Sequence, residues 1–278
     1  MIEKTLPAKG SRSAGVALCK EVGEARDADG RINEFLGALS HEVRTPLSAM
    51  QNGAYVLDHA APGSDLARQA RGLISRQVEE LTRLFDDLMD VTRIHRDRIE
   101  LEMVRLDLRE LIGKTIEAHR ARFEEGQVNL EFAPALSSPR VNADPVRLAQ
   151  VIGILLVNAI RFTGRGGSTT VSLSTLPADK LAVIRVADTG AGIERGALLQ
   201  VFDPFAQAPT TTDPVRRGLR LGLALVKGLI ELHGGDVRAA SDGPGTGSEF
   251  IVRLPLAPRE RTVSGVVRRA AREFMPRS

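Results

Sequence analysis

Residues 35–47 read FLGALSHEVRTPL, and the rest of the chain is organised around them and around His41 in particular. It belongs to a segment in which apolar residues recur every three or four positions, which predicts an amphipathic helix over residues 29–59. His41 falls between two of these positions, so we expect its imidazole on the flank of the helix, within reach of solvent. The apolar positions are Leu36, Leu39, Val43, Leu47, Met50, Ala54 and Leu57.

The residues next to His41 supply the parts of a nucleophilic site. Glu42 places a carboxylate beside the imidazole, where it could fix the ring tautomer or accept a proton. Thr45 follows one helical turn later, and its hydroxyl could orient a water molecule. On their own, a histidine and a glutamate next to each other on a helix would be interpreted as an ordinary solvated pair. The full string of residues 35–47 favours the nucleophilic site instead.

A second helix is predicted after a turn at residues 60–65, where Ser64 or Asp65 could cap it. Its apolar residues recur about every 3.5 positions, which is typical of a coiled-coil-like seam. Two helices alone bury such a stripe poorly, so we expect a homodimer that forms a four-helix bundle. The seam residues are Leu66, Ala70, Leu73, Ile74, Val78, Leu81, Leu84, Phe85, Leu88, Val91 and Ile94.

The string at residues 35–47 closely resembles the phosphoacceptor motif of two-component sensor histidine kinases. The resemblance implies a dimerisation and phosphotransfer domain in which His41 is phosphorylated and Glu42 acts as the base. It also implies that Thr45 serves the reverse activity, removal of phosphate from the partner. A chain of this family must carry an ATP site as well.

The pattern after Arg98 changes to that of an α/β domain. Residues 99–107 read as a short strand or linker, and a helix is predicted over residues 108–125. Asp144 and Pro145 then begin another helix, because an acidic cap followed by proline at the first helical position is a typical start. Strand-like runs occupy residues 128–132, 141–143, 169–175, 181–186 and 250–256.

The helix after Pro145 is apolar almost all round, so we expect it to be buried. Asn158 is its polar exception; alone it could be a satisfied core residue, but it would also suit a hydrated magnesium ion on triphosphate oxygens. The segment resembles the asparagine box of the histidine-kinase ATP-binding fold, which implies that Asn158 is the Mg²⁺ ligand. Arg161 stands where the family usually has lysine and should face the phosphates, and Phe162 follows it in the box.

A carboxylate and two glycines follow the strand that ends near residue 186. Asp188 could accept a hydrogen bond from an adenine amino group, while Gly190 and Gly192 let the backbone approach the base. An Asp-x-Gly-x-Gly pattern alone often marks a turn. Placed after Asn158, it resembles the first glycine box of the family, which implies that Asp188 reads adenine.

The remaining boxes follow in order. Residues 201–205 are similar to the phenylalanine box, and residues 206–217 read as a mobile lid. A glycine-containing helix start at residues 218–222 could bind phosphate through free amides, and residues 243–250 are similar to the last glycine box. The nucleotide-binding residues predicted in these segments are Gly218, Arg220, Leu221, Gly222 and Thr246.

Two positions depart from the family pattern. Ile154 replaces a second asparagine that is common four residues before the magnesium ligand, and Arg220 replaces the middle glycine of the second glycine box. These departures motivate an alternative: a degenerate kinase that dimerises and binds a response regulator but turns over little ATP. An ATPase of the gyrase or chaperone type is disfavoured, because it would not need the string around His41.

Composition limits the other possibilities. The 278 residues carry a net charge of +3, which is too small to argue for nucleic acid as a partner. A single cysteine, Cys19, fits a reducing compartment. No apolar run approaches the roughly 20 residues that span a bilayer, and we find no signal peptide, so we expect a cytoplasmic protein without a transmembrane segment.

We therefore predict an α+β protein that autophosphorylates on His41 with ATP and Mg²⁺ and passes the phosphoryl group to a response regulator receiver domain. The predicted division is a flexible leader (1–28), the dimerisation and phosphotransfer domain (29–98), a linker (99–107), the catalytic ATP-binding domain (108–257) and a basic tail (258–278). The tail is a weak amphipathic pattern that could touch a partner or a membrane, although a solvated tail is the simpler interpretation.

Overall fold

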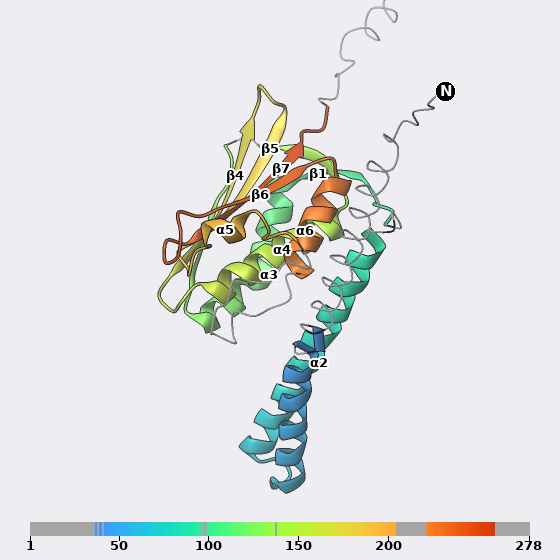
Figure 1. Cartoon of the computed structure of the whole chain (residues 1–278), viewed down its shortest axis with the longest axis vertical. Coiled ribbons are helices and arrows are strands. Elements are labelled where there is room, and N and C mark those ends of the chain that lie inside the picture. The colour runs from blue at the N-terminus through green and yellow to red at the C-terminus, as the bar shows by residue number, and fades with distance from the viewer. Residues whose placement is uncertain are drawn as a thin grey trace, which may run out of the picture.

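A helical hairpin extends from an α/β domain in this computed structural model (Figure 1). The structure describes residue 37 and residues 39–40, 42–94, 96, 99–136, 138–203 and 221–258. The predicted leader, lid and basic tail lie outside the described residues, as do His41, Gly218 and Arg220.

The hairpin has the predicted form. Residues 42–59 are helical, and α2 (Asp65–Ile94) returns alongside them after the turn. Ser64 is the cap, because its hydroxyl accepts a hydrogen bond from the Ala67 amide at 3.2 Å. The two helices approach closely at Gly53, where an added Cβ would lie 2.9 Å from the Ile74 side chain.

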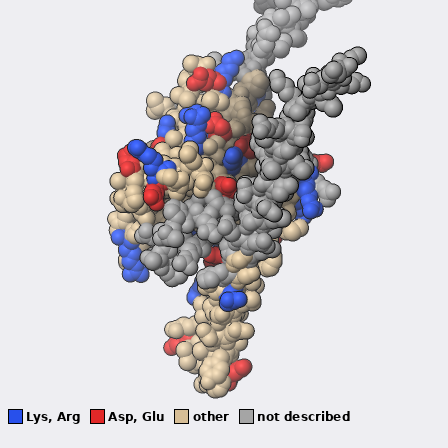
Figure 2. Space-filling view, in the orientation of Figure 1, with Lys and Arg blue, Asp and Glu red and all other residues tan. Residues whose placement is uncertain are grey.

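The hairpin leaves much of its apolar seam in solvent. Leu66 is 55% exposed, Phe85 52% and Val78 49%. A groove between the two helices is lined in part by Gly53, Val56, Leu66, Ala70 and Leu73. Figure 2 shows that uncharged side chains make up most of the visible surface at the free end of the hairpin, while acidic and basic side chains are interspersed over the α/β domain.

The α/β domain is built on a five-stranded mixed sheet with the order β2-β4-β5-β7-β6. Only β2 and β4 run parallel; the other neighbours are antiparallel. The strands are β2 (Asn129–Ala133), β4 (Ser168–Leu176), β5 (Leu181–Asp188), β6 (Asp236–Ala240) and β7 (Ser248–Pro255). Helices α3 (Leu108–Gly126), α4 (Pro145–Phe162) and α6 (Leu221–Leu232) pack together against the sheet (Figure 1).

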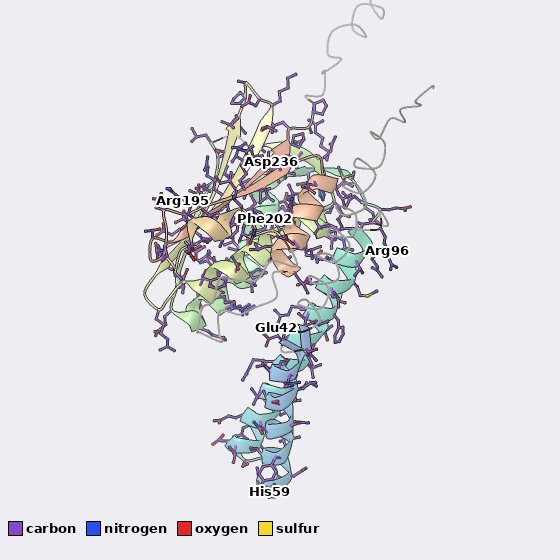
Figure 3. All side chains as sticks on the ribbon, viewed as in Figure 1. Glu42, His59, Arg96, Arg195, Phe202 and Asp236 are labelled. Atoms are coloured by element: carbon purple, nitrogen blue, oxygen red, sulfur yellow. The ribbon has the colours of Figure 1, made fainter. Side chains whose placement is uncertain are left out.

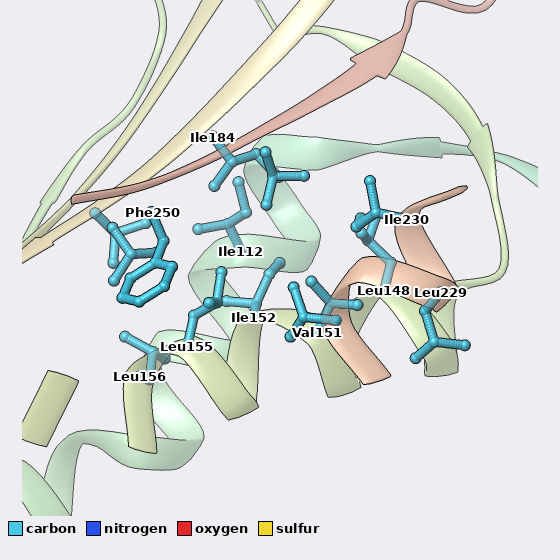
Figure 4. Packing of buried hydrophobic residues seen from close by; sticks show 14 of the residues in the cluster. Ile112, Leu148, Val151, Ile152, Leu155, Leu156, Ile184, Leu229, Ile230 and Phe250 are labelled. Atoms are coloured by element: carbon cyan, nitrogen blue, oxygen red, sulfur yellow. The ribbon is translucent and has the colours of Figure 1, made fainter. Parts of the chain in front are cut away.

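The core lies between these helices and the sheet (Figure 4). Ile112, Leu148 and Leu155 contribute from α3 and α4, and Ile184 and Phe250 contribute from β5 and β7. Each of these five side chains is at most 2% exposed. The alternating burial along β4 and β5 follows from their single helix-covered face.

Part of the predicted linker is a strand. β1 (Val104–Asp107) pairs antiparallel with β3 (Arg140–Ala143) in a separate two-stranded sheet. The sequence analysis left this open between a strand and a linker, because the alternation there is loose. The prediction also lacked β6 and the short helix α5 (Arg195–Leu198).

The prediction that α4 is buried holds for one side of the helix only. Its core side is buried, but Gly153, Ile154, Val157 and Asn158 form a half-buried strip along the opposite side. Among the described residues, α4 is the one helix whose length and composition would suit a membrane span; here it packs against α3, α6 and the sheet. The half-buried strip is where a ligand could reach an otherwise apolar helix.

Asp144 joins three segments at the start of α4. Its carboxylate accepts hydrogen bonds from the Val146 and Arg147 amides and from the Glu102 amide. Burial opposes ionisation, but these amide hydrogen bonds lower the pKa of the carboxyl below its usual value. The Asp144 amide donates to Nε2 of buried His233 at 3.0 Å.

His233 stands just after α6, and its ring connects α6 to α4. Its Nδ1 donates to the Leu229 carbonyl at 2.7 Å while Nε2 accepts from Asp144, which fixes the tautomer with the proton on Nδ1. No local sequence pattern predicted a role for this histidine. It is a structural residue that keeps the ends of two core helices together.

The last turns of α2 pack on the α/β domain. Val91 is 6% exposed and belongs to the core cluster, and Ile94 touches Gly228 of α6. Asp90, on the same turns, pairs with Arg147 of α4. Burial first, and then the charges of Asp90 and Asp86, raise the pKa of the Asp87 carboxyl to about 6.

Removal of the Asp144 carboxylate should destabilise the α/β domain. We expect Asp144→Ala to lower the free energy of unfolding by about 1–2 kcal/mol, because two helix amides lose their cap and the Glu102 amide loses its acceptor. Asp144→Asn keeps a capping oxygen and should lose clearly less. Denaturant titration measures both variants, and equal losses would contradict this account.

Asp87→Asn should stabilise the protein at high pH more than at low pH. The native pKa of about 6 lies above the ordinary carboxyl pKa of 3.8, so ionised Asp87 destabilises the native state fully above pH 6, and this cost disappears below pH 3.8. The gain in melting temperature of Asp87→Asn over wild type should be large at pH 8 and shrink towards pH 4. A gain that is independent of pH would refute the raised pKa.

Candidate functional site

Asp188 is a buried carboxylate held in one orientation at the end of β5. It is 8% exposed, and its Oδ1 accepts a hydrogen bond from the Gly190 amide at 2.8 Å. Its Oδ2 accepts from the Ser248 hydroxyl at 2.5 Å. A carboxylate oxygen has a second lone pair, so Asp188 can still accept a hydrogen from a ligand amino group.

Ser248 is a site residue that the sequence analysis missed. It stands directly opposite Asp188 in the register between β5 and β7. Its hydroxyl holds the carboxylate that the prediction assigned to adenine. The signal was present, because Ser248 follows the glycines of the last box, but only the strand register brings the two residues together.

Neighbouring main-chain atoms leave room only for glycine at positions 190 and 192. A Cβ at Gly190 would lie 2.4 Å from the Phe162 carbonyl oxygen at the end of α4. Gly192 has a φ of 69°, and a Cβ there would lie 2.0 Å from the Gly243 carbonyl oxygen. These contacts leave no room for side chains, so the two glycine loops and the end of α4 fit closely around Asp188.

Hydrogen bonds between main-chain atoms hold the same loops together. The Ala191 amide donates to the Phe162 carbonyl at 3.0 Å, and the Gly245 amide donates to the Ala191 carbonyl at 2.7 Å. Thr246 is exposed on the second loop, where its hydroxyl donates to the Gly243 carbonyl at 2.7 Å. The structure therefore brings Phe162, Gly190, Gly192 and Thr246 together near Asp188.

The half-buried strip of α4 carries the second group of predicted residues. Asn158 is half-buried on this strip, one turn after Ile154. The start of α6 packs here, because a Cβ at Gly222 would lie 3.0 Å from Ile154 Cγ2. Arg161 is exposed further along, with its guanidinium 5.7 Å from the centre of the Phe162 ring.

Leu221 has a different environment from its predicted neighbours. It is 2% exposed and belongs to the hydrophobic core at the start of α6. Its side chain is therefore occupied by packing, and only its main chain is free to approach a ligand. Gly222, in contrast, lies where α6 meets the half-buried strip of α4.

The phosphoacceptor string lies on the other domain. Glu42 is half-buried and Thr45 is exposed on the first helix of the hairpin, while Pro46 is buried. His41, the residue on which the prediction centres, lies outside the described residues. Figure 3 shows Glu42 on the hairpin, below the α/β domain in this view.

The donor set suits a nucleotide with its magnesium ion better than a protein-bound metal. Within the described residues, no three His, Cys, Asp or Glu side chains gather into a metal site. Asn158 offers one amide oxygen on the half-buried strip of α4. Mg²⁺ typically takes one or two protein oxygens and completes its shell with phosphates and water, so a single asparagine fits such an ion.

Two family models match the chain. Residues 31–97 match the His Kinase A (phospho-acceptor) domain, and residues 143–258 match the histidine kinase-, DNA gyrase B-, and HSP90-like ATPase. The first match contains Glu42 and Thr45, and the second contains Asn158 and Asp188.

Curated relatives match along most of this chain. The autoinducer 2 sensor kinase/phosphatase LuxQ of Vibrio cholerae is 32% identical over 226 residues, which is 80% of this chain and 26% of LuxQ. The circadian input-output histidine kinase CikA of Synechococcus elongatus is 34% identical over 236 residues, which is 83% of this chain and 31% of CikA. The chain thus spans about a quarter to a third of these two relatives.

Solved structures share the fold. Full-length ShkA in complex with AMPPNP aligns with a TM-score of 0.60 and 28% identity, over 80% of this chain and 45% of ShkA. The histidine kinase ThkA in complex with the response regulator protein TrrA aligns with a TM-score of 0.59 and 24% identity, over 87% and 67% of the two chains. With both domain matches, these relatives and the geometry around Asp188 taken together, the chain belongs to the two-component sensor histidine kinases.

Proposed function

We propose that this chain is an ATP-dependent protein histidine kinase that phosphorylates His41 and passes the phosphoryl group to an aspartate of a response regulator. The observation that carries the proposal is the buried Asp188 carboxylate, oriented by Gly190 and Ser248 between two glycine loops. It accompanies a phosphoacceptor domain on the same chain. The relatives that match both domains are kinases by name.

The nucleotide would bind with its base at Asp188 and its phosphates towards the start of α6. Asp188 would accept the adenine amino hydrogen, and the surrounding loops would exclude water from this contact. Asn158 would hold a Mg²⁺ ion on the phosphates, and the ion would supply charge neutralisation. Arg161, Gly222 and, from the predicted helix start at residues 218–222, Gly218 and Arg220 are the remaining proposed phosphate contacts.

For the phosphoryl transfer, the protein mainly has to position His41 and the nucleotide, and its side chains take little direct part in bond making and breaking. An imidazole nitrogen of His41 attacks the γ-phosphorus in line, the bond from the γ-phosphorus to the bridging oxygen breaks, and ADP leaves with the bond electrons. Glu42 accepts the proton that the imidazole loses or holds the ring in the reactive tautomer. Thr45, exposed one turn further on, would orient the water that removes phosphate from the partner.

A homodimer and a receiver domain are the proposed partners. The exposed seam residues of the hairpin support dimerisation, because a second copy would bury them. Membership of the two-component family supports the receiver domain. Use of ATP as the phosphoryl donor supports a cytoplasmic location for this part of the chain.

One observation favours a second candidate, a degenerate kinase that acts as a dimeric response-regulator-binding module. Ile154 replaces a polar residue of the family's ATP site and packs against Gly222. An apolar side chain at this place removes a possible ligand of hydrated phosphate or metal. Nucleotide binding and turnover separate the two candidates.

Asp188→Asn should weaken nucleotide binding. The variant presents an amide where the base amino group and the Ser248 hydroxyl need acceptors, so we expect the Kd for ATP with Mg²⁺ to rise roughly tenfold or more. Isothermal titration calorimetry measures this, and Asp179→Asn on the exposed turn between β4 and β5 is the matched control. An unchanged Kd for Asp188→Asn would remove Asp188 from the site.

His41→Ala should abolish autophosphorylation without loss of nucleotide affinity. Wild type incubated with γ-labelled ATP and Mg²⁺ should carry acid-labile label, and the variant should carry none because its nucleophile is missing. Calorimetry on the variant checks that the ATP site is intact. Absence of label on a wild type that is folded and binds ATP would favour the binding module.

A further inference from the structure

A buried charge pair connects the end of the hairpin to the catalytic domain. Asp90 of α2 is 6% exposed, and its Oδ2 lies 2.6 Å from Arg147 Nη1 of α4. Gln150 Nε2 donates to the same oxygen at 3.2 Å, and Arg147 Nη1 also donates to Gln150 Oε1 at 2.9 Å. Arg93 Nη1 approaches the other carboxylate oxygen at 4.0 Å. A charge buried this deeply requires such partners, so the geometry of the contact is closely defined.

An apolar contact beside this pair fixes the same arrangement. Gly228 of α6 packs against Ile94 of α2 so closely that an added Cβ would lie 2.8 Å from Ile94 Cδ1. Val91, one turn before Ile94, is 6% exposed in the core cluster. We call these two contacts, Asp90 with Arg147 and Gln150 and Ile94 with Gly228, the interdomain clasp.

The clasp lies at one end of α4 and the nucleotide residues lie towards the other. His233, after the end of α6, contacts Asp144 at the start of α4, whereas Gly222 at the start of α6 meets Ile154. The two helices are therefore antiparallel, and the nucleotide end is marked by Ile154 and Asn158. Arg147 and Gln150, which hold Asp90, precede it along α4.

The part of α2 that precedes Asp90 in the sequence lies alongside the nucleotide end of α4, which is marked by Ile154 and Asn158. Burial, and next the charge of Arg83 on α2, lower the pKa of Arg122 on α3, so the two guanidinium groups lie within electrostatic range of each other. Arg122 lies one turn after His119, which packs on Gly153 of α4. Arg83 is thus level with the nucleotide half of α4, two turns away from the clasp.

The phosphoacceptor helix reaches the same level. Gly53 packs against Ile74 across the hairpin, and both helices rise equally per residue, so Glu42 is level with α2 near Arg83. Figure 3 agrees, because Glu42 lies lower along the hairpin than Arg96, near the edge of the α/β domain where α6 begins. The clasp thus holds the phosphate end of the site at the level of the part of the hairpin that carries Glu42 and the string around His41.

We propose that the interdomain clasp positions the catalytic domain for phosphoryl transfer, with Asp90 and Gly228 as positioning residues that act through the docking of the domain rather than through contact with the nucleotide. The proposal rests on the proposed kinase activity. Transfer within such a docked pair is effectively unimolecular, so a domain released from α2 would lose the gain in rate that a fixed approach provides.

Variants that open the clasp should slow transfer and leave ATP binding alone. We expect Asp90→Asn and Gly228→Val each to lower the initial rate of His41 autophosphorylation at saturating ATP about tenfold or more, with the Kd for ATP within twofold of wild type. Asp86→Asn, an exposed carboxylate one turn before Asp90, is the matched control and should keep the wild-type rate. A wild-type or faster rate in the first two variants overturns the proposal.

A cross-link tests the docked arrangement directly. Ile94→Cys with Gly228→Cys, in a Cys19→Ser background that removes the single native cysteine, places two thiols at the close contact. The oxidised protein should keep at least half of the rate of its reduced form. A rate that is lost on oxidation and returns on reduction would mean that docking blocks transfer, and the proposal would be wrong.

The proposed activity and the clasp can fail separately. A wild-type protein that binds ATP but never labels His41 would overturn both. A wild type that labels His41 normally, together with an equally active Asp90→Asn variant, would overturn the clasp alone.

Discussion

The hydrogen bonds of Asp144 are the constraint on which the α/β domain depends. One residue caps α4 with its carboxylate, receives the chain arriving from the hairpin through the Glu102 amide, and donates its own amide to His233. The direction of α4, its distance from α6 and the entry of the linker are therefore set at one point. The residues proposed to contact a nucleotide lie along those two helices, at the end of β5 or in the glycine loop between β6 and β7.

At the proposed base end of the site, few residues likewise hold the important side chain. Asp188 is held by the main chain of its own loop and by a serine from the neighbouring strand. The glycines around it pack against carbonyl oxygens within the protein, so the loops are close-fitting before any ligand arrives. A preformed acceptor in a dry environment favours one hydrogen-bond pattern in the ligand over others, because a mismatched group would leave the buried carboxylate unpaired.

Local sequence patterns predicted the parts that local physics determines. The hairpin, its turn, the Asp144–Pro145 helix start and the strands that lead to Asp188 all have periodic or capping signals, and each is present. Ser248, His233 and the Asp90–Arg147 pair were missed because their partners are distant in sequence and only strand register or helix packing unites them. The burial of α4 was overestimated because hydrophobicity cannot distinguish a side that faces a core from one that faces a ligand.

The strand order has a consequence for folding. β5 and β7 are neighbours in the sheet, yet the hydrogen bond between Asp188 and Ser248 joins residues 60 positions apart. The hairpins β4–β5 and β6–β7 can form early through local contacts, whereas β7 must close a long loop before it pairs with β5. The carboxylate gains its serine only when that last strand arrives, so a partly folded chain has no partial version of this pocket. A ligand that binds there stabilises only the completely folded domain. At a free ligand concentration of 100 times its Kd, the free energy of unfolding rises by about 2.7 kcal/mol.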